Sequence, residues 1–211
     1  MNELKKYLPA IVFTLLYILG FSVWFIAQGN YEFILYTLVL IFFAGLITLT
    51  INRSHFDPLI IWGLALWGFL HMAGGGIKIG GEVLYALVLW PVFDWGNELI
   101  LFKYDQIVHF FGFAVATLVV YHLLRSHLTG RVNQPVLLFI VIMAGIGLGA
   151  LNEIVEFIAV LAIPDTNVGG YYNTGLDLIF NLLGASAAGL YLYYRREPEF
   201  YAPKFGALSG K

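Results

Sequence analysis

The sequence predicts an all-α protein of the polytopic membrane class: a transmembrane helical bundle of about six helices, with a re-entrant or interfacial segment between helices 3 and 4. Two observations carry this prediction. Of the 211 residues, 60% are hydrophobic and 11% are charged, at a mean hydropathy of +0.83, whereas soluble domains carry about 25% charged residues. Apolar runs near the roughly 20 residues that a membrane-crossing helix needs recur along the chain. We therefore expect residues 1–211 to form a single integral membrane domain.

The expected spans follow these apolar runs in chain order. They cover about 7–27, 33–51, 58–73, 104–124, 135–163 and 174–194. The first begins with basic residues, as a signal peptide does, but its apolar core is too long and no small-residue cleavage site follows, so we interpret it as a retained helix. The third begins at Pro58, where a missing N–H costs nothing. The fifth is long enough to tilt, and "GASAAG" in the sixth suits close helix contact in lipid.

The segment between the third and fourth spans reads "GGGIKIGGEVLYALVLWPVFDWGNELILFK". It is polar and interrupted by glycine, and its apolar core, 83–90, is too short to cross a bilayer. We expect it to be interfacial or re-entrant, with Trp90 and Trp95 at the level of the lipid headgroups.

The distribution of basic residues predicts the orientation. With six spans, both termini share one side of the membrane. That side collects nine basic residues, and the other has two, Lys78 and Lys103. The nine are Lys5, Lys6, Arg53, Arg125, Arg131, Arg195, Arg196, Lys204 and Lys211. The positive-inside rule then places both termini in the cytoplasm of a multi-pass protein of the cytoplasmic (inner) membrane.

The polar residues of the spans converge on the outer half of this topology. His71 ends the third span, and Asp105 and His109 open the fourth at a spacing that puts them on one helix face. Glu153 follows Pro135 by 18 residues, about 27 Å of helix, so it also lies near the outer side. The complete set is His71, Asp105, His109, Asn152, Glu153, Glu156, Asp177 and Asn181. Charged groups at membrane depth are costly, so we expect one shared polar site.

The composition of this set allows several kinds of chemistry. Imidazoles and carboxylates bind hard or borderline divalent metals, so a divalent metal ion is the candidate cofactor. Crowded carboxylates also suit acid–base catalysis or a proton relay. The chain has no cysteine, which excludes thiolate ligands. A net charge of −2 points to no nucleic-acid partner. HExxH, GxSxG and P-loop motifs are absent from the sequence.

We therefore assign candidate roles by residue. The candidate catalytic residues are Glu153, Glu156, Asp105 and Asp177, and the candidate metal ligands are His71, His109, Glu153, Glu156 and Asp177. Asn152, Asn181 and Asp165 would support them. Simpler readings stay open: hydrogen bonds between helices for the glutamates, a helix-start role for Asp105, and a turn for Asp165 after Pro164.

Four stretches of the chain also carry a resemblance. They are "LHMAGG" at 70–75, "YDQIVHFFGF" at 104–113, "ALNEIVEF" at 150–157 and "DTNVGGYYNTGLDLIFNLLGA" at 165–185. In order, spacing and residue type they resemble the YjdF-type inner-membrane protein family, a domain of unknown function. A looser likeness is to VanZ-like membrane proteins, which share a D-x-x-x-H helix start, a glutamate helix and a D-x-x-x-N helix. The first resemblance implies an integral membrane protein without a settled activity, and the second hints at a cell-envelope substrate.

Some positions depart from that family pattern. Gly76 stands where a second histidine would be expected, and Gln106 where an arginine would follow Asp105. Gly170 and Asn173 stand where acidic residues would precede the sixth span. Each departure removes a potential ligand or charge partner.

Three functions from different classes remain at this point. The first is a membrane-embedded enzyme that acts on a lipid or lipid-linked envelope substrate. The second is a small transporter or ion-coupled carrier that uses the carboxylates, although a carrier should place polar residues in both membrane halves or show an inverted repeat. The third is a non-catalytic scaffold or binding subunit whose polar cluster makes the bundle rigid. Membrane lipids are the expected surroundings of all three.

Overall fold

Six long helices make up most of the structure, a computed structural model that describes residues 3–94, 100–128, 132–163, 166 and 168–195. Within these ranges the helices are α1 (Glu3–Gln28), α2 (Tyr31–Ser54), α3 (Pro58–Gly76), α4 (Tyr104–Arg125), α5 (Gln134–Ala162) and α6 (Tyr171–Arg195). All six are long and apolar enough to cross a membrane. The predicted all-α bundle is therefore confirmed, and the helices exceed most of the expected spans by a few residues.

Polar residues at helix starts explain several of these boundaries. Asn30, Asp57 and Asn133 cap α2, α3 and α5, and the side chain of each accepts a hydrogen bond from a backbone N–H in the first turn. Such caps satisfy donors that have no partner inside the helix. The fifth helix ends at Ala162, one residue short of the expected end, because Ile163 has an extended backbone.

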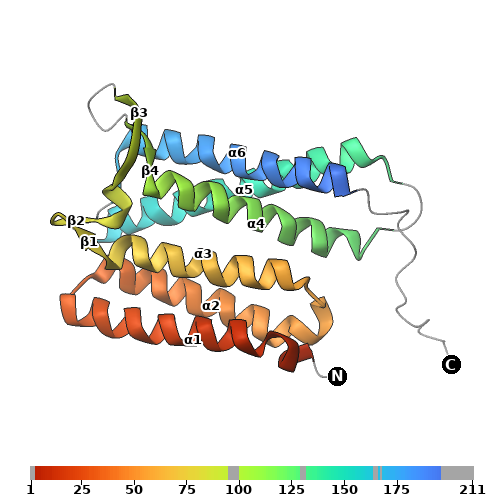
Figure 1. Cartoon of the computed structure of the whole chain (residues 1–211), viewed down its shortest axis with the longest axis horizontal. Coiled ribbons are helices and arrows are strands. Elements are labelled where there is room, and N and C mark those ends of the chain that lie inside the picture. Colours follow the sequence, from red (N-terminus) through yellow and green to blue (C-terminus); the bar gives the residue numbers. More distant parts are fainter. Residues whose placement is uncertain (1–2, 95–99, 129–131, 164–165, 167, 196–211) are drawn as a thin grey trace.

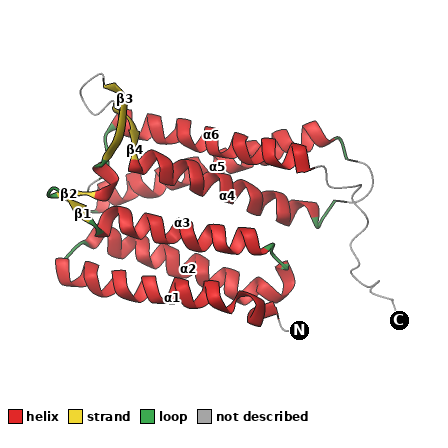
Figure 2. Ribbon diagram, viewed as in Figure 1, coloured by secondary structure: helices red, strands yellow, loops and turns green. Residues whose placement is uncertain are grey.

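The segment between α3 and α4 forms short strands rather than a helix. The strands are β1 (Lys78–Ile79), β2 (Glu82–Val83), β3 (Val88–Asp94) and β4 (Ile100–Lys103), with a 3-10 turn, η1 (Leu84–Ala86), after β2. β1 pairs antiparallel with β2, and β3 with β4. Figure 2 shows all of the strands at one end of the bundle, which agrees with the interfacial alternative for the described part of this segment. Trp90 is exposed there, and Trp95 lies outside the described residues.

The helices pack as two groups of three, α1–α3 and α4–α6, which lie side by side (Figure 1). The contact between α3 and α4 joins the groups. A buried cluster of residues from α1, α2 and α3 also contains Ala159 of α5, which is fully buried. α5 therefore packs against both groups.

Candidate metal centre

Buried polar side chains gather where α4 begins, α5 ends and α6 begins, which is the strand end of the bundle (Figure 1). Asp177 and Asn181 of α6 are fully buried, and His109 and Glu153 are at least nine-tenths buried. These four side chains come from three successive helices, α4, α5 and α6. The structure thus brings together most of the polar residues that the sequence predicted would converge.

His109 occupies the centre of this cluster. Its Nδ1 lies 3.0 Å from Asn181 Oδ1, so the imidazole donates a hydrogen bond from Nδ1 to the amide oxygen. The Nε2 atom lies 3.5 Å from Asp105 Oδ1 and 4.0 Å from Glu156 Oε1. A histidine that donates through one ring nitrogen offers the other to a metal ion. Nε2 of His109 is therefore the nitrogen that faces two carboxylates and is available as a ligand.

Two overlapping groups in the described residues have the composition of a metal site. Asp105, His109 and Asp177 form one group, and His109, Glu153 and Glu156 form the other. In each group the candidate ligand atoms all lie within 4.8 Å of one another. Because His109 belongs to both, an ion next to it could draw ligands from α4, α5 and α6 together. One imidazole and several carboxylates form an oxygen-rich set that suits a hard or borderline divalent ion.

Two asparagines donate hydrogen bonds to three of the carboxylates and hold them in place. Nδ2 of Asn173 donates to Asp105 Oδ2 at 3.1 Å and to Asp177 Oδ2 at 2.6 Å. Nδ2 of Asn152 donates to Glu156 Oε1 at 2.8 Å. Hydrogen bonds to the ligands of a metal hold them in position. Asn173 therefore holds Asp105 with its other oxygen, Oδ1, towards His109, and Asn152 holds the Glu156 oxygen that lies 4.0 Å from His109 Nε2.

Three polar atoms of the cluster have no hydrogen-bond partner among the described residues. They are Glu153 Oε1, Asp177 Oδ1 and Asn181 Nδ2, and all three are buried. Glu153 Oε1 lies 3.6 Å from His109 Nδ1, beyond hydrogen-bond distance. Buried polar atoms are nearly always paired, and those that are not call for an explanation such as an ion. The two carboxylate oxygens are acceptors that a cation would satisfy.

The charge of the cluster is unbalanced. Asp105, Glu153, Glu156 and Asp177 lie together, and the ion pairs that these carboxylates make within the described residues are with His109. An uncompensated buried ion costs several kcal/mol. Four ionised carboxylates around one imidazole therefore require either additional positive charge or bound protons.

Two glycines let the helices approach closely enough to build this cluster. A Cβ on Gly184 of α6 would lie 2.0 Å from the backbone oxygen of Phe110 in α4. A Cβ on Gly149 of α5 would lie 2.8 Å from Asn181 Nδ2. Small residues at such crossings allow close helix packing in a membrane. This packing brings Asn181 within reach of His109.

His71 does not belong to either of the two groups. Its Nδ1 pairs with the hydroxyl of Tyr85 from η1, and its ring packs against Phe33 and Tyr36 of α2. Burial, together with the smaller effect of the nearby carboxylates Asp105 and Glu156, raises the pKa of Tyr85 well above its ordinary value. Tyr85 therefore keeps its proton at neutral pH, and the pair is a neighbour of the metal-binding groups rather than part of them.

One candidate supporting residue and two departures from the family pattern remain to be placed. Asp165 lies outside the described residues. Gln106 is fully buried and accepts hydrogen bonds from the N–H groups of Phe102 and Lys103, so it fixes the junction of β4 and α4. Gly76 lies against the ring of Phe21, where a Cβ would meet it at 2.5 Å. A histidine at 76 would therefore need a different packing of α1 on α3.

Sequence reasoning missed the contributions of Asn173, Tyr85 and Tyr36. The i, i+4 spacing of Asn173 and Asp177 was a signal that could have identified the first. Tyr85 carried no such signal, because it lies in an irregular turn whose position depends on the tertiary packing. Tyr36 has a buried hydroxyl without a hydrogen-bond partner in the described residues and lies beside His71.

Comparisons with known proteins agree with this description. The model of a family described as "Predicted membrane protein (DUF2238)" matches residues 9–198, a range that includes the whole cluster. A protein of Thermotoga maritima described as "Uncharacterized protein" is 32% identical over 102 residues, which cover 48% of this chain and 53% of that protein. The chain thus spans about half the length of this curated relative. No solved structure matches. The predicted YjdF-type resemblance is confirmed, and the VanZ-like likeness stays a prediction.

Proposed function

We propose that this chain, which belongs to the DUF2238 family of predicted membrane proteins, holds a divalent metal ion between α4, α5 and α6 and uses it as the catalytic centre of an enzyme. The substrate class that we propose is a lipid or a lipid-linked molecule. The observation that carries the proposal is the pair of buried carboxylate oxygens, Glu153 Oε1 and Asp177 Oδ1, that lack a hydrogen-bond partner in the described chain. A cation beside His109 would give both a partner.

The donor atoms fit this kind of ion. His109 with Asp105, Asp177 and Glu153 supplies one nitrogen and several oxygens, and Glu156 lies beside them. Mn²⁺ and Mg²⁺ accept carboxylate oxygens, and Zn²⁺ accepts both imidazole and carboxylate. A divalent ion would also offset part of the negative charge that the cluster otherwise concentrates in a low-dielectric region.

The four carboxylates of the cluster differ in how exposed their side chains are. Glu153 and Asp177 are buried, which suits ligands, whereas the side chains of Asp105 and Glu156 are 16% and 17% exposed. A bound divalent ion supplies Lewis-acid polarisation and lowers the pKa of coordinated water. Glu156, which Asn152 holds in place, is then the best placed general base at the edge where a substrate would enter.

The location of the cluster supports a membrane substrate. The residues lie within helices that can span a bilayer, and the family model covers nearly the whole chain as a membrane protein. A lipid or lipid-linked molecule can reach an edge formed by Asp105 and Glu156 by lateral movement between helices. A water-soluble substrate would instead need an aqueous route to this edge.

Two other functions give different expectations. A carrier needs its site to open to both sides in turn, but the two metal-binding groups of the described residues lie at the same end of the bundle. A scaffold predicts that replacing a carboxylate by its amide changes only stability. The experiments below separate these outcomes from catalysis.

The first experiment measures bound metal. The protein would be purified in detergent without chelators, and Mn, Zn, Fe and Mg would be quantified by elemental mass spectrometry. We expect a near-stoichiometric metal in the wild type and its loss in the Glu153→Gln/Asp177→Asn double variant. Glu82→Gln in β2 changes an exposed carboxylate outside the cluster and is the control. A folded wild type that takes up no metal when these ions are supplied would overturn the proposal.

The second experiment tests catalysis. The metal-loaded protein would be incubated with total membrane lipids, and the products would be followed by lipid mass spectrometry with and without a chelator. We expect a metal-dependent change in one lipid class that Glu156→Gln abolishes while metal stays bound. If metal binds and no lipid changes, the metal site stands and its catalytic use on lipids is refuted.

A further inference from the structure

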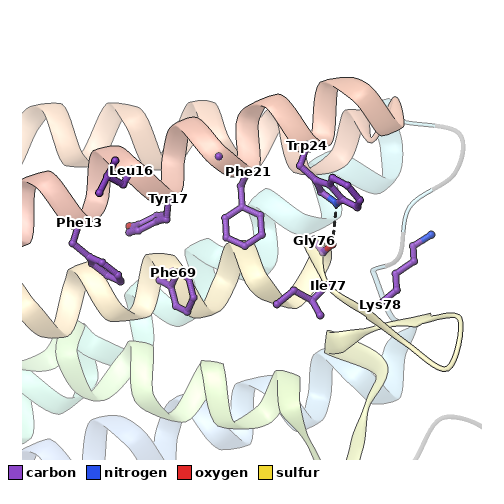
Figure 3. A pocket seen from close by; sticks show the side chains of 10 residues that line it. Phe13, Leu16, Tyr17, Phe21, Trp24, Phe69, Gly76, Ile77 and Lys78 are labelled. Carbon is purple, nitrogen blue, oxygen red and sulfur yellow. Dashed lines mark hydrogen bonds between the residues drawn. The ribbon is translucent and has the colours of Figure 1, made fainter.

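An apolar groove of about 650 Å³ runs between α1 and α3 (Figure 3), and its lining includes no member of the two metal-binding groups. Its lining on α1 includes Phe13, Phe21 and Trp24, and Phe69 of α3 forms the opposite wall. Figure 3 shows the rings of Phe21 and Phe69 between the two helices. Gly20 widens the groove, since a Cβ at this position would meet no atom within 4 Å. The groove therefore opens on a face of the bundle that the hydrocarbon of a membrane would surround.

The length of the groove corresponds to one leaflet. From Phe13 to Trp24 the α1 helix advances 11 residues, about 16 Å. Half of the hydrocarbon core of a bilayer measures about 15 Å. A groove of this length at one end of a membrane-spanning helix accommodates the chain of a lipid from the headgroup level to the middle of the bilayer.

One end of the groove is polar. The indole Nε1 of Trp24 donates to the backbone oxygen of Gly76 at 2.9 Å, which fixes the ring where α3 ends. Lys78 lies two residues further along and lines the same end (Figure 3). Tryptophan is enriched at the headgroup level, and a lysine near the membrane surface attracts anionic lipids. The groove thus has an apolar channel with a cationic group at its mouth.

We propose that this groove binds one acyl chain of an anionic phospholipid and that Lys78 contacts its phosphate. A cation at one end of an apolar groove as long as one leaflet argues for a lipid chain with its headgroup rather than for a helix of another protein. The aromatic walls suit an apolar chain, and the single cation suits one anionic headgroup. This proposal is independent of the metal-binding groups.

The test is native mass spectrometry of the detergent-purified protein during titration with phosphatidylglycerol or with phosphatidylcholine of the same chains. We expect one phosphatidylglycerol to bind about fivefold more tightly than phosphatidylcholine, the preference that a single lysine contributes. Lys78→Gln should remove this preference and leave chain binding in place. Lys5→Gln changes an exposed lysine at the opposite end of the bundle and is the matched control.

A second pair of variants tests the channel itself. Gly20→Phe should fill the groove and reduce binding of both lipids by about tenfold, and Gly20→Leu should have a smaller effect in the same direction. Gly45→Phe adds the same ring to an exposed glycine of α2 that also has no atom within 4 Å, and should bind lipid as the wild type does. Wild-type binding by a folded Gly20→Phe protein would overturn the acyl-chain site. Equal affinity of the wild type for both lipids would overturn the role of Lys78.

Discussion

Nδ1 of His109 donates a hydrogen bond to Asn181 Oδ1 across 3.0 Å, which links α4 to α6 over 72 positions of sequence. This contact determines which ring nitrogen of His109 carries the hydrogen and which faces Asp105 and Glu156. The histidine is thereby prepared as a ligand through Nε2. Asn181 holds its own position because Gly149 leaves room for it against α5.

Replacing Asn181 by alanine should lower the affinity for the metal ion and leave the protein folded. Loss of a hydrogen-bond partner behind a ligand histidine typically lowers metal affinity about 10- to 100-fold. Titration of the metal-free protein with Mn²⁺ and with Zn²⁺ measures this change. Asn133→Ala removes the α5 cap at the other end of the bundle and should lower stability with metal affinity unchanged. Equal metal affinity of Asn181→Ala and wild type would show that this contact does not prepare His109.

His71→Ala should retain the metal. The imidazole of His71 pairs with Tyr85 and belongs to neither metal-binding group, so its removal should cost stability through a lost buried hydrogen bond, about 1–3 kcal/mol. His109→Ala should lose the metal completely. Elemental analysis of the two purified variants measures the difference. Loss of the metal from both would mean that His71 moves into the site when an ion binds.

Asn173→Asp should make the protein depend on a cation for stability. The amide donates to both Asp105 and Asp177, and a carboxylate would replace two hydrogen bonds by repulsion between like charges. Thermal unfolding without divalent ions should occur at lower temperature than in the wild type, and added Mn²⁺ should restore more stability to the variant than to the wild type. Asn173→Ala removes the donor without adding charge. This variant should also unfold at a lower temperature than the wild type, but Mn²⁺ should stabilise it less than it stabilises Asn173→Asp. A variant whose unfolding temperature ignores Mn²⁺ would contradict a cation at this position.

Gly184→Val should destabilise the bundle. Its Cβ would lie 2.0 Å from a backbone oxygen of α4, and a backbone cannot rotate away as a flexible side chain can. We expect a loss of about 1–3 kcal/mol in the free energy of unfolding, the usual cost of overpacking. Gly147→Val on α5 places the same side chain where a Cβ meets nothing within 4 Å and should change this free energy far less. Denaturation in mixed detergent micelles compares the two, and equal losses would contradict close α4–α6 contact as the cause.

The helices and their polar faces could be predicted from local patterns. Apolar runs of membrane-spanning length predict α1 to α6 because backbone groups in a bilayer must be satisfied within the helix. The spacing of Asp105 with His109, and of Asp177 with Asn181, places each pair on one face. The alternating direction of successive spans then carries these faces to the same end of the bundle. The confirmed bundle and the clustering of these polar residues both follow from such short-range regularities.

The chain by itself thus determined the number of helices, their approximate limits and the end of the bundle where polar residues collect, because hydrophobic length and helical periodicity are local properties. Only the tertiary structure decided that His109 is shared by two groups, that His71 pairs with Tyr85 instead, and that Asn173 bridges two aspartates. Those outcomes depend on the rotation of each helix and on how closely the helices approach one another, which Gly149 and Gly184 permit between residues far apart in the sequence.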